Sequence, residues 1–257
     1  MFYNNINPTL LRFGPFEIRY YGIIFVAAFV IAYFMIYYLA QKRELKLSRD
    51  DVVDYLFYEI VGVVVGARLF EIIFYEPAYY FSSPFQMLAV WKGGLSFHGG
   101  LVGGVIATLL FCRRKKIRFY DLIDIIVIPA AFGLFLGRIA NFTNGELVGR
   151  VTGVPWCVKF RNYEGCRHPS QLYESFKNLV IFFGLWFLKD KKLKRGMLFW
   201  SFVVMYSVLR FFIEFFKDPV GELGLFLGLT TGQWLNIAMF ITGIVFMVRI
   251  KNEQPVL

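Results

Sequence analysis

The sequence predicts an all-α polytopic membrane protein with seven spanning helices and a small external cap. Of its 257 residues, 58% are hydrophobic and 20% are aromatic, whereas soluble domains are roughly half apolar. The apolar residues gather in seven runs that approach the ~20 residues needed to cross a bilayer. Short clusters of lysine and arginine separate several of these runs. Together these observations indicate a chain that crosses the membrane repeatedly.

Each predicted span is placed where apolar sequence reaches helix length between polar breaks. The first run follows an N-terminus without the basic segment and cleavable core of a signal peptide, so we expect it to remain as a helix. The third and fifth runs are short. In chain order the predicted spans are residues 20–39, 52–74, 96–112, 120–137, 172–188, 196–216 and 232–248.

Basic clusters set the predicted orientation. QKRELKLSRDD follows the first run, CRRKKIR the third and KDKKLKR the fifth, and the seventh ends in RIK. Because loops rich in lysine and arginine stay inside, the N-terminus should lie outside and the C-terminus in the cytoplasm. This orientation requires an odd number of spans. The same clusters explain the net charge of +10, so we expect no nucleic-acid partner.

Two external segments carry unusual sequence. An aromatic stretch with two prolines, near residues 75–95, suits an arm in the membrane interface, and residues 141–171 should form the cap. Cys157 and Cys166 lie in this cap, on the side where disulfides are permitted, and their pairing stays open. No loop reaches domain size, so we expect a single membrane-embedded catalytic domain over residues 1–257.

Three arginines, Arg68, Arg138 and Arg210, lie late in helices that climb toward the outer face. At ~1.5 Å per residue, Arg210 would lie roughly 20 Å from the inner end of its helix. Charges at such depth are costly and usually functional. Because few acids accompany the arginines, we expect an anionic partner, and guanidinium groups bind phosphate in a bidentate manner. The sequence therefore predicts a phospholipid headgroup site in the outer leaflet.

Structural interpretations of the same residues stay open. Arg210 and Glu214 are four residues apart, and Arg68 and Glu71 are three apart, so each could form a local ion pair. His98 lies in FHGGLVGG, where the glycines favour close helix packing. His98 could therefore be a packing residue.

The segment GRIANFTNGELVG, residues 137–149, resembles the signature of the bacterial prolipoprotein diacylglyceryl transferases, G-R-x-G/A-N-F-x-N-x-E-x-x-G. Every fixed position matches, and Thr143 stands where the family more often has an apolar residue. Further blocks are similar and occur in the same order: RYYG at 19–22, GARLF at 66–70, GGLSFHGG at 93–100, RHPSQLYE at 167–174 and RFFIEFF at 210–216. The resemblance covers nearly the whole chain.

The resemblance implies an enzyme of the bacterial inner membrane with its active site toward the outer leaflet. It would move the diacylglyceryl group of phosphatidylglycerol to the lipobox cysteine of preprolipoprotein signal peptides, forming a thioether and releasing glycerol phosphate. By motif position, the residues most tied to catalysis would be His98, Arg138 and Arg210. Arg138 would also bind substrate, and the other residues expected to bind or support it are Asn141, Tyr21, Arg68, Glu146, Gly149, Tyr206 and Glu214.

His98 is the expected base for the substrate thiol; alternatively, the field of the arginines activates the thiol and His98 orients lipid. No cofactor or metal is expected, because His98 and His168 lie in different blocks without a carboxylate cluster.

Other protein classes fit the sequence less well. A transporter would need a polar path through both membrane halves, and a scaffold that only binds lipid would not need His98. A protease using Ser96 and His98 is disfavoured because residues two apart face different sides of a helix.

Overall fold

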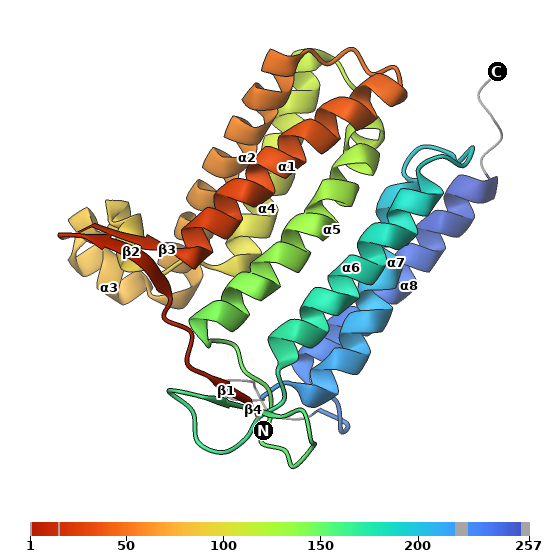
Figure 1. Cartoon of the computed structure of the whole chain (residues 1–257). Helices are drawn as coiled ribbons and strands as arrows, with labels where there is room; N and C mark the ends of the chain where they lie inside the picture. The colour runs from red at the N-terminus through yellow and green to blue at the C-terminus, as the bar shows by residue number, and fades with distance from the viewer. Residues whose placement is uncertain (1, 15, 219–225, 253–257) are drawn as a thin grey trace. The chain divides into compact units, whose positions relative to one another are not determined.

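The computed structural model describes residues 2–14, 16–218 and 226–252, and most of them are helical (Figure 1). The chain divides into two compact units. Unit 1 comprises Met1–Met35 and Asp124–Leu257, and unit 2 comprises Ile36–Ile123. The single catalytic domain over residues 1–257 stays a prediction.

Long helices occupy all of the predicted apolar runs. They are α1 (Tyr20–Lys42), α2 (Arg49–Phe70), α4 (Phe97–Lys115), α5 (Phe119–Asn144), α6 (Ser170–Leu188), α7 (Met197–Ile213) and α8 (Thr231–Asn252). In the described part of the chain, four helices are long and apolar enough to cross a membrane: α1, α5, α7 with its last turn to Phe216, and α8. The mostly helical membrane fold is confirmed, whereas seven crossings and their orientation stay predictions.

Side-chain caps fix where several helices begin. Ser48 Oγ accepts the N–H of Asp51 at 3.1 Å, and Asp51 accepts the N–H of Ser48 at 2.8 Å, so α2 starts with a reciprocal capping box. Thr230 and Gln233 make the same exchange at the start of α8, at 3.1 and 3.0 Å. These pairs satisfy N–H groups that have no partner inside the helix.

A glycine seam joins α2 and α4 in unit 2. Gly62 and Gly66 of α2 face Gly99 and Gly103 of α4 so closely that side chains would collide. A Cβ on Gly103 would lie 2.0 Å from the Gly62 carbonyl oxygen, and one on Gly66 would lie 2.4 Å from that of Gly99. Small residues at four-residue spacing let membrane helices pack backbone to backbone. These glycines therefore serve helix packing.

The arm between α2 and α4 is built around Arg68. After α2 come a π-helical turn (Glu71–Tyr75), α3 (Pro77–Ser82) and two short turns (Pro84–Leu88 and Val90–Lys92). Arg68 is 6% exposed, and its guanidinium lies 4.7 Å from the centre of the Tyr80 ring. All three guanidinium nitrogens donate to backbone carbonyls of the arm, those of Gln86, Met87, Ala89, Gly93 and Gly94. Arg68 thus holds the arm against the end of α2.

Short strands, absent from the all-α prediction, lie outside the long helices. In Figure 1, β1 (Phe2–Asn4) runs parallel to β4 (Val158–Phe160), so the N-terminal segment pairs with the cap. Val148, Val158 and Phe160 form an apolar cluster there, against which Phe142 packs. Both strands have only three residues, so a prediction based on helix-length apolar runs misses them.

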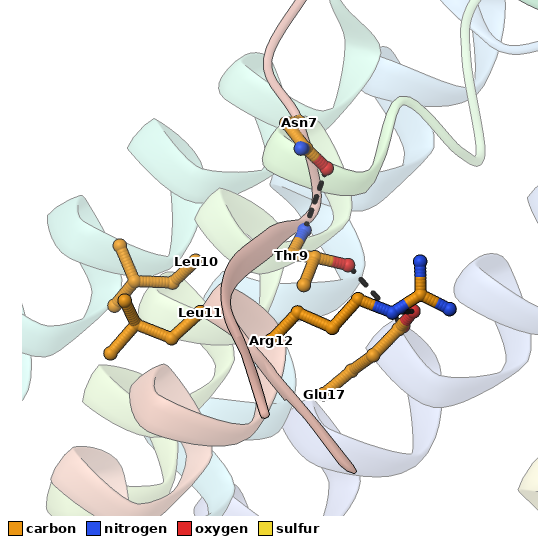
Figure 2. A pocket seen from close by; sticks show the side chains of 6 residues that line it. All are labelled: Asn7, Thr9, Leu10, Leu11, Arg12 and Glu17. Carbon is orange, nitrogen blue, oxygen red and sulfur yellow. Dashed lines mark hydrogen bonds and ion pairs between the residues drawn. The ribbon is translucent and has the colours of Figure 1, made fainter. Parts of the chain in front are cut away.

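The other two strands form a hairpin before α1. β2 (Thr9–Phe13) pairs antiparallel with β3 (Phe16–Arg19), and α1 begins at the next residue. Figure 2 shows residues that line a cavity of about 370 Å³ at β2: Thr9, Arg12 and Glu17 lie on one side of the strand, and Leu10 and Leu11 lie on the other. Glu17 pairs with Arg12 at 3.5 Å. The bonded Arg19 guanidinium lowers the pKa of Glu17.

Candidate active site

The last two turns of α5 carry Arg138 and Asn141, and a glycine ends the helix just beyond them. Gly145 has φ +68°, a left-handed conformation that suits glycine. Its N–H bonds to the carbonyl of Phe142, and the N–H of Glu146 bonds to the carbonyl of Asn141, the pattern of a Schellman motif. Because the chain turns back at Gly145, the Glu146 carboxylate can accept a hydrogen bond from the Asn141 side-chain amide at 2.7 Å. Two predicted site residues are thereby locked together.

Glu174 of α6 joins arginines from two other helices. Its carboxylate lies 3.5 Å from Nε of Arg138 and 2.9 Å from a terminal nitrogen of Arg210. Lys177, one turn along α6, approaches the same carboxylate at 3.4 Å. The Glu174 side chain is 2% exposed, and a buried charge of this kind is tolerated only when it is paired. Glu174 is therefore the centre of the ion-pair network.

The network continues along one face of α7. Tyr206, Arg210 and Glu214 recur every four residues, and the predicted Arg210–Glu214 pair is confirmed at 2.7 Å. The Lys177 ammonium lies 3.7 Å from the centre of the Tyr206 ring, within cation–π range. Among the described residues of this network, three cations thus share two buried carboxylates.

This arrangement corrects one step of the sequence argument. The arginines were expected to lack acidic partners, yet Arg138 and Arg210 share Glu174, and Arg210 also contacts Glu214. Arg68 lies in the other unit and donates to carbonyl oxygens. The need for an external anion therefore cannot be inferred from unpaired charge alone.

Two further predicted residues lie near the network in unit 1. Tyr21, on α1, stacks on Phe25 with ring centres 4.8 Å apart, and its hydroxyl lies within electrostatic reach of Glu146 and Arg138. Gly149 is a backbone junction, since a Cβ there would lie 2.5 Å from the carbonyl oxygen of Phe216. Gly149 thus lets the end of the signature pack directly on the chain that follows α7.

Unit 2 holds His98. It occupies the second position of α4 and is exposed, and its Nδ1 lies 3.4 Å from the Tyr75 hydroxyl. Ser96 is buried and instead caps α4 by accepting the N–H of Gly99 at 3.4 Å. The two side chains therefore have different surroundings, as expected from their spacing.

Comparison with known proteins decides the family. The family model described as prolipoprotein diacylglyceryl transferase matches residues 8–249. The chain belongs to this family. It is 42% identical to the phosphatidylglycerol–prolipoprotein diacylglyceryl transferase of Geobacter sulfurreducens, with 99% of both chains covered. Proteins with the same name are 39% identical in Bordetella avium, with 97% of each chain covered, and 41% identical in Rickettsia canadensis, with 95% of this chain and 96% of that one covered.

The transferase network contains two residues that sequence reasoning did not select, Glu174 and Lys177. Both lie on a polar face of α6 that also includes Gln171 and Asn178, and all four are at most 3% exposed. Gln171 donates to the carbonyl of Glu146 at 2.6 Å. A polar stripe at helical spacing in RHPSQLYESFKN was the available signal.

The cap of the transferase is tied down covalently. Cys157 and Cys166 form a disulfide with their Cα atoms 5.5 Å apart, which resolves the pairing left open by the sequence. The His168 backbone carbonyl accepts the N–H of Gly149 at 3.0 Å. The His168 side chain places Nδ1 3.1 Å from the Tyr173 hydroxyl, and burial lowers the pKa of this imidazole. His168 thus connects the cap to the first turns of α6.

Beyond α7, Lys217 adds another amine near the network. Burial lowers the pKa of Lys217, and the Arg210 guanidinium acts in the same direction while Glu214 opposes it.

The described residues contain no group of three His, Cys, Asp or Glu side chains that could hold a metal ion.

Proposed function

We propose that the chain transfers the sn-1,2-diacylglyceryl group of phosphatidylglycerol to the lipobox cysteine of preprolipoproteins, the first step of bacterial lipoprotein maturation. Its relatives are named for phosphatidylglycerol and prolipoprotein. The observation that carries the proposal is the position of Arg138 and Arg210 on the two sides of one carboxylate. Guanidinium groups arranged around a two-oxygen anion also suit a phosphodiester.

The proposed membrane arrangement has seven spans, an external N-terminus and a cytoplasmic C-terminus in the inner membrane. Long helices at all seven apolar runs support it, as do the basic clusters between them. The disulfide between α5 and α6 suits the oxidising exterior. On this arrangement, Arg138 and Arg210 lie near the outer ends of α5 and α7, where a headgroup of the outer leaflet would be reached.

The reaction forms one bond and breaks one. The cysteine sulfur attacks the glycerol carbon that carries the phosphate; a C–S bond forms, the C–O bond breaks, and its electron pair leaves with glycerol phosphate. The thiol proton passes to a base and finally to the product phosphate or water. Negative charge grows on the leaving phosphate, so positioned cations lower the barrier. Arg138 and Arg210 supply these cations in the proposal, and Asn141 and Tyr206 supply hydrogen bonds.

The acidic residues have an organising part in this proposal. Glu174 and Glu214 hold Arg210 from two directions, and Glu146 orients the Asn141 amide. Tyr21 would complete the lipid contacts beside Arg138. Arg68 has an indirect part, since its guanidinium nitrogens already donate to the arm. These residues arrange the donors before the lipid arrives, which is how preorganised sites gain rate.

A direct assay tests the function. Purified protein incubated with phosphatidylglycerol and a lipobox peptide should add one diacylglyceryl mass to the cysteine, detected by mass spectrometry. A peptide with serine in place of cysteine should stay unmodified. A protein that binds both substrates and leaves the peptide mass unchanged would be a binding scaffold, and the enzymatic proposal would be rejected.

His98→Gln tests the assignment of His98 as the base. The expected result is a large loss of kcat at neutral pH, with partial recovery at alkaline pH as the peptide thiol ionises without help. The measurement is a pH–rate profile for both proteins. His168→Gln is the matched control, because His168 belongs to the cap. An unchanged neutral rate for His98→Gln would leave thiol activation to the arginines.

A further inference from the structure

A polar cavity lies where the N-terminal segment, the end of α5 and the cap meet. Its volume is about 500 Å³, within the ~300–1,000 Å³ typical of ligand pockets. All of its lining residues belong to unit 1. The polar side chains among them are Asn4, Asn5, Thr143, Asn144, Arg161 and Asn162.

Hydrogen bonds hold one part of the cavity lining in place. The Asn4 side chain donates to the carbonyl of Phe142 at 2.7 Å and accepts a hydrogen bond from the N–H of Ile6 at 3.2 Å, so it holds the N-terminal segment to α5. β1 pairs with β4 directly beside it (Figure 1). Arg161 and Asn162, whose side chains are exposed, also line the cavity.

The lining has a chemical preference. Amide side chains offer a donor and an acceptor together, which matches the N–H and C=O of a peptide group. Asn5, Asn144 and Asn162 contribute such amides to the lining. The described lining includes a guanidinium and no carboxylate. The cavity therefore suits the main chain of a polypeptide segment whose net charge is neutral or weakly negative.

Its position connects it to the ion-pair network. Arg138 and Asn141 are three residues apart on α5 and are therefore neighbours on its surface, and Asn144 is the last residue of the helix. The helix rises ~1.5 Å per residue, so Asn144 lies ~9 Å beyond Arg138 along the axis. An extended chain covers ~3.3 Å per residue, so about three residues span this distance.

We propose that this cavity binds the main chain of the acceptor polypeptide just after its reacting cysteine, about two to four residues downstream. The inference rests on the proposed function, because that function places the cysteine beside Arg138 and Asn141 and sends the following residues outward. Recognition through amides would read the backbone and tolerate varied side chains. Acceptors with different sequences after the cysteine would then share one binding mode.

The experiment compares two peptides that differ only in length after the cysteine position. One ends one residue after it and the other continues for six residues; both carry serine there and a fluorophore at the N-terminus. Fluorescence anisotropy gives the Kd of each for the full-length protein in phosphatidylglycerol nanodiscs. We expect the longer peptide to bind about tenfold more tightly, an effect of one or two hydrogen bonds. Cysteine versions supply KM and kcat in parallel.

The double variant Arg161→Ala with Asn162→Ala should remove this difference, while KM for phosphatidylglycerol stays unchanged. Lys159→Ala is the matched control, because Lys159 carries the same charge on β4 and lies outside the lining. Equal Kd values for both peptides in the unaltered protein would overturn the inference, and so would a raised KM for phosphatidylglycerol in the double variant, which would indicate a lipid headgroup. Length-dependent binding without transfer would support the cavity while rejecting the proposed reaction.

Discussion

Arg210→Lys is expected to lower kcat by about 100-fold to 1,000-fold, the usual cost of losing a positioned donor at a developing negative charge. Arg210 contacts Glu174 and Glu214 through different nitrogens of one planar group. A lysine ammonium is a point charge and cannot hold both carboxylates while also facing a phosphate. The measurement is steady-state kcat with phosphatidylglycerol and a lipobox peptide.

The control for this prediction is Arg12→Lys. Arg12 pairs with Glu17 on the exposed hairpin, so the same substitution there should leave kcat unchanged, because exposed ion pairs contribute little. Circular dichroism and thermal unfolding would show whether each variant folds. A folded Arg210→Lys protein with the kcat of the unaltered protein would remove Arg210 from the catalytic group.

Gly103→Ala is expected to destabilise the protein by about 1–3 kcal/mol, the range for overpacking a close-packed interior. The added Cβ would lie 2.0 Å from the Gly62 carbonyl oxygen, so α2 and α4 would have to separate. Gly103→Leu should prevent folding altogether. Thermal unfolding in detergent measures both effects as a lower Tm or a loss of soluble protein.

Gly133→Ala is the matched control, because Gly133 lies inside α5 with open space where its Cβ would be. Alanine forms helices better than glycine by about 1 kcal/mol, so this variant should keep or raise Tm. Equal Tm values for Gly103→Ala and Gly133→Ala would show that the seam tolerates a wider spacing.

Most of the helical fold could be predicted from apolar runs, because helix length in a membrane follows bilayer thickness. The predicted run at 120–137 underestimates α5, which continues to Asn144. That extension includes Arg138 and Asn141, which polarity alone would place outside a span. The hairpin and the β1–β4 pair were missed, since strands of three to five residues do not produce helix-length apolar runs.

The site was only partly predictable. Local spacing was sufficient for the Arg210–Glu214 pair, because both residues lie on one helix. Glu174 could not be assigned in this way, since its partners Arg138 and Arg210 lie on α5 and α7, and only tertiary packing brings three helices together. The role of Arg68 in the arm depends equally on tertiary structure, since its acceptors are carbonyl oxygens 18 to 26 residues away.

Glu174 has a consequence for turnover. If Arg138 and Arg210 bind the phosphate as proposed, release of glycerol phosphate would leave both guanidinium groups beside Glu174, so the vacant enzyme would not hold two uncompensated cations in a low-dielectric interior. In that proposal Glu174 offsets part of the positive charge of the arginines, so the product phosphate would be held less tightly. An internal counter-anion of this kind would limit product inhibition while preserving enough positive charge to attract the next lipid.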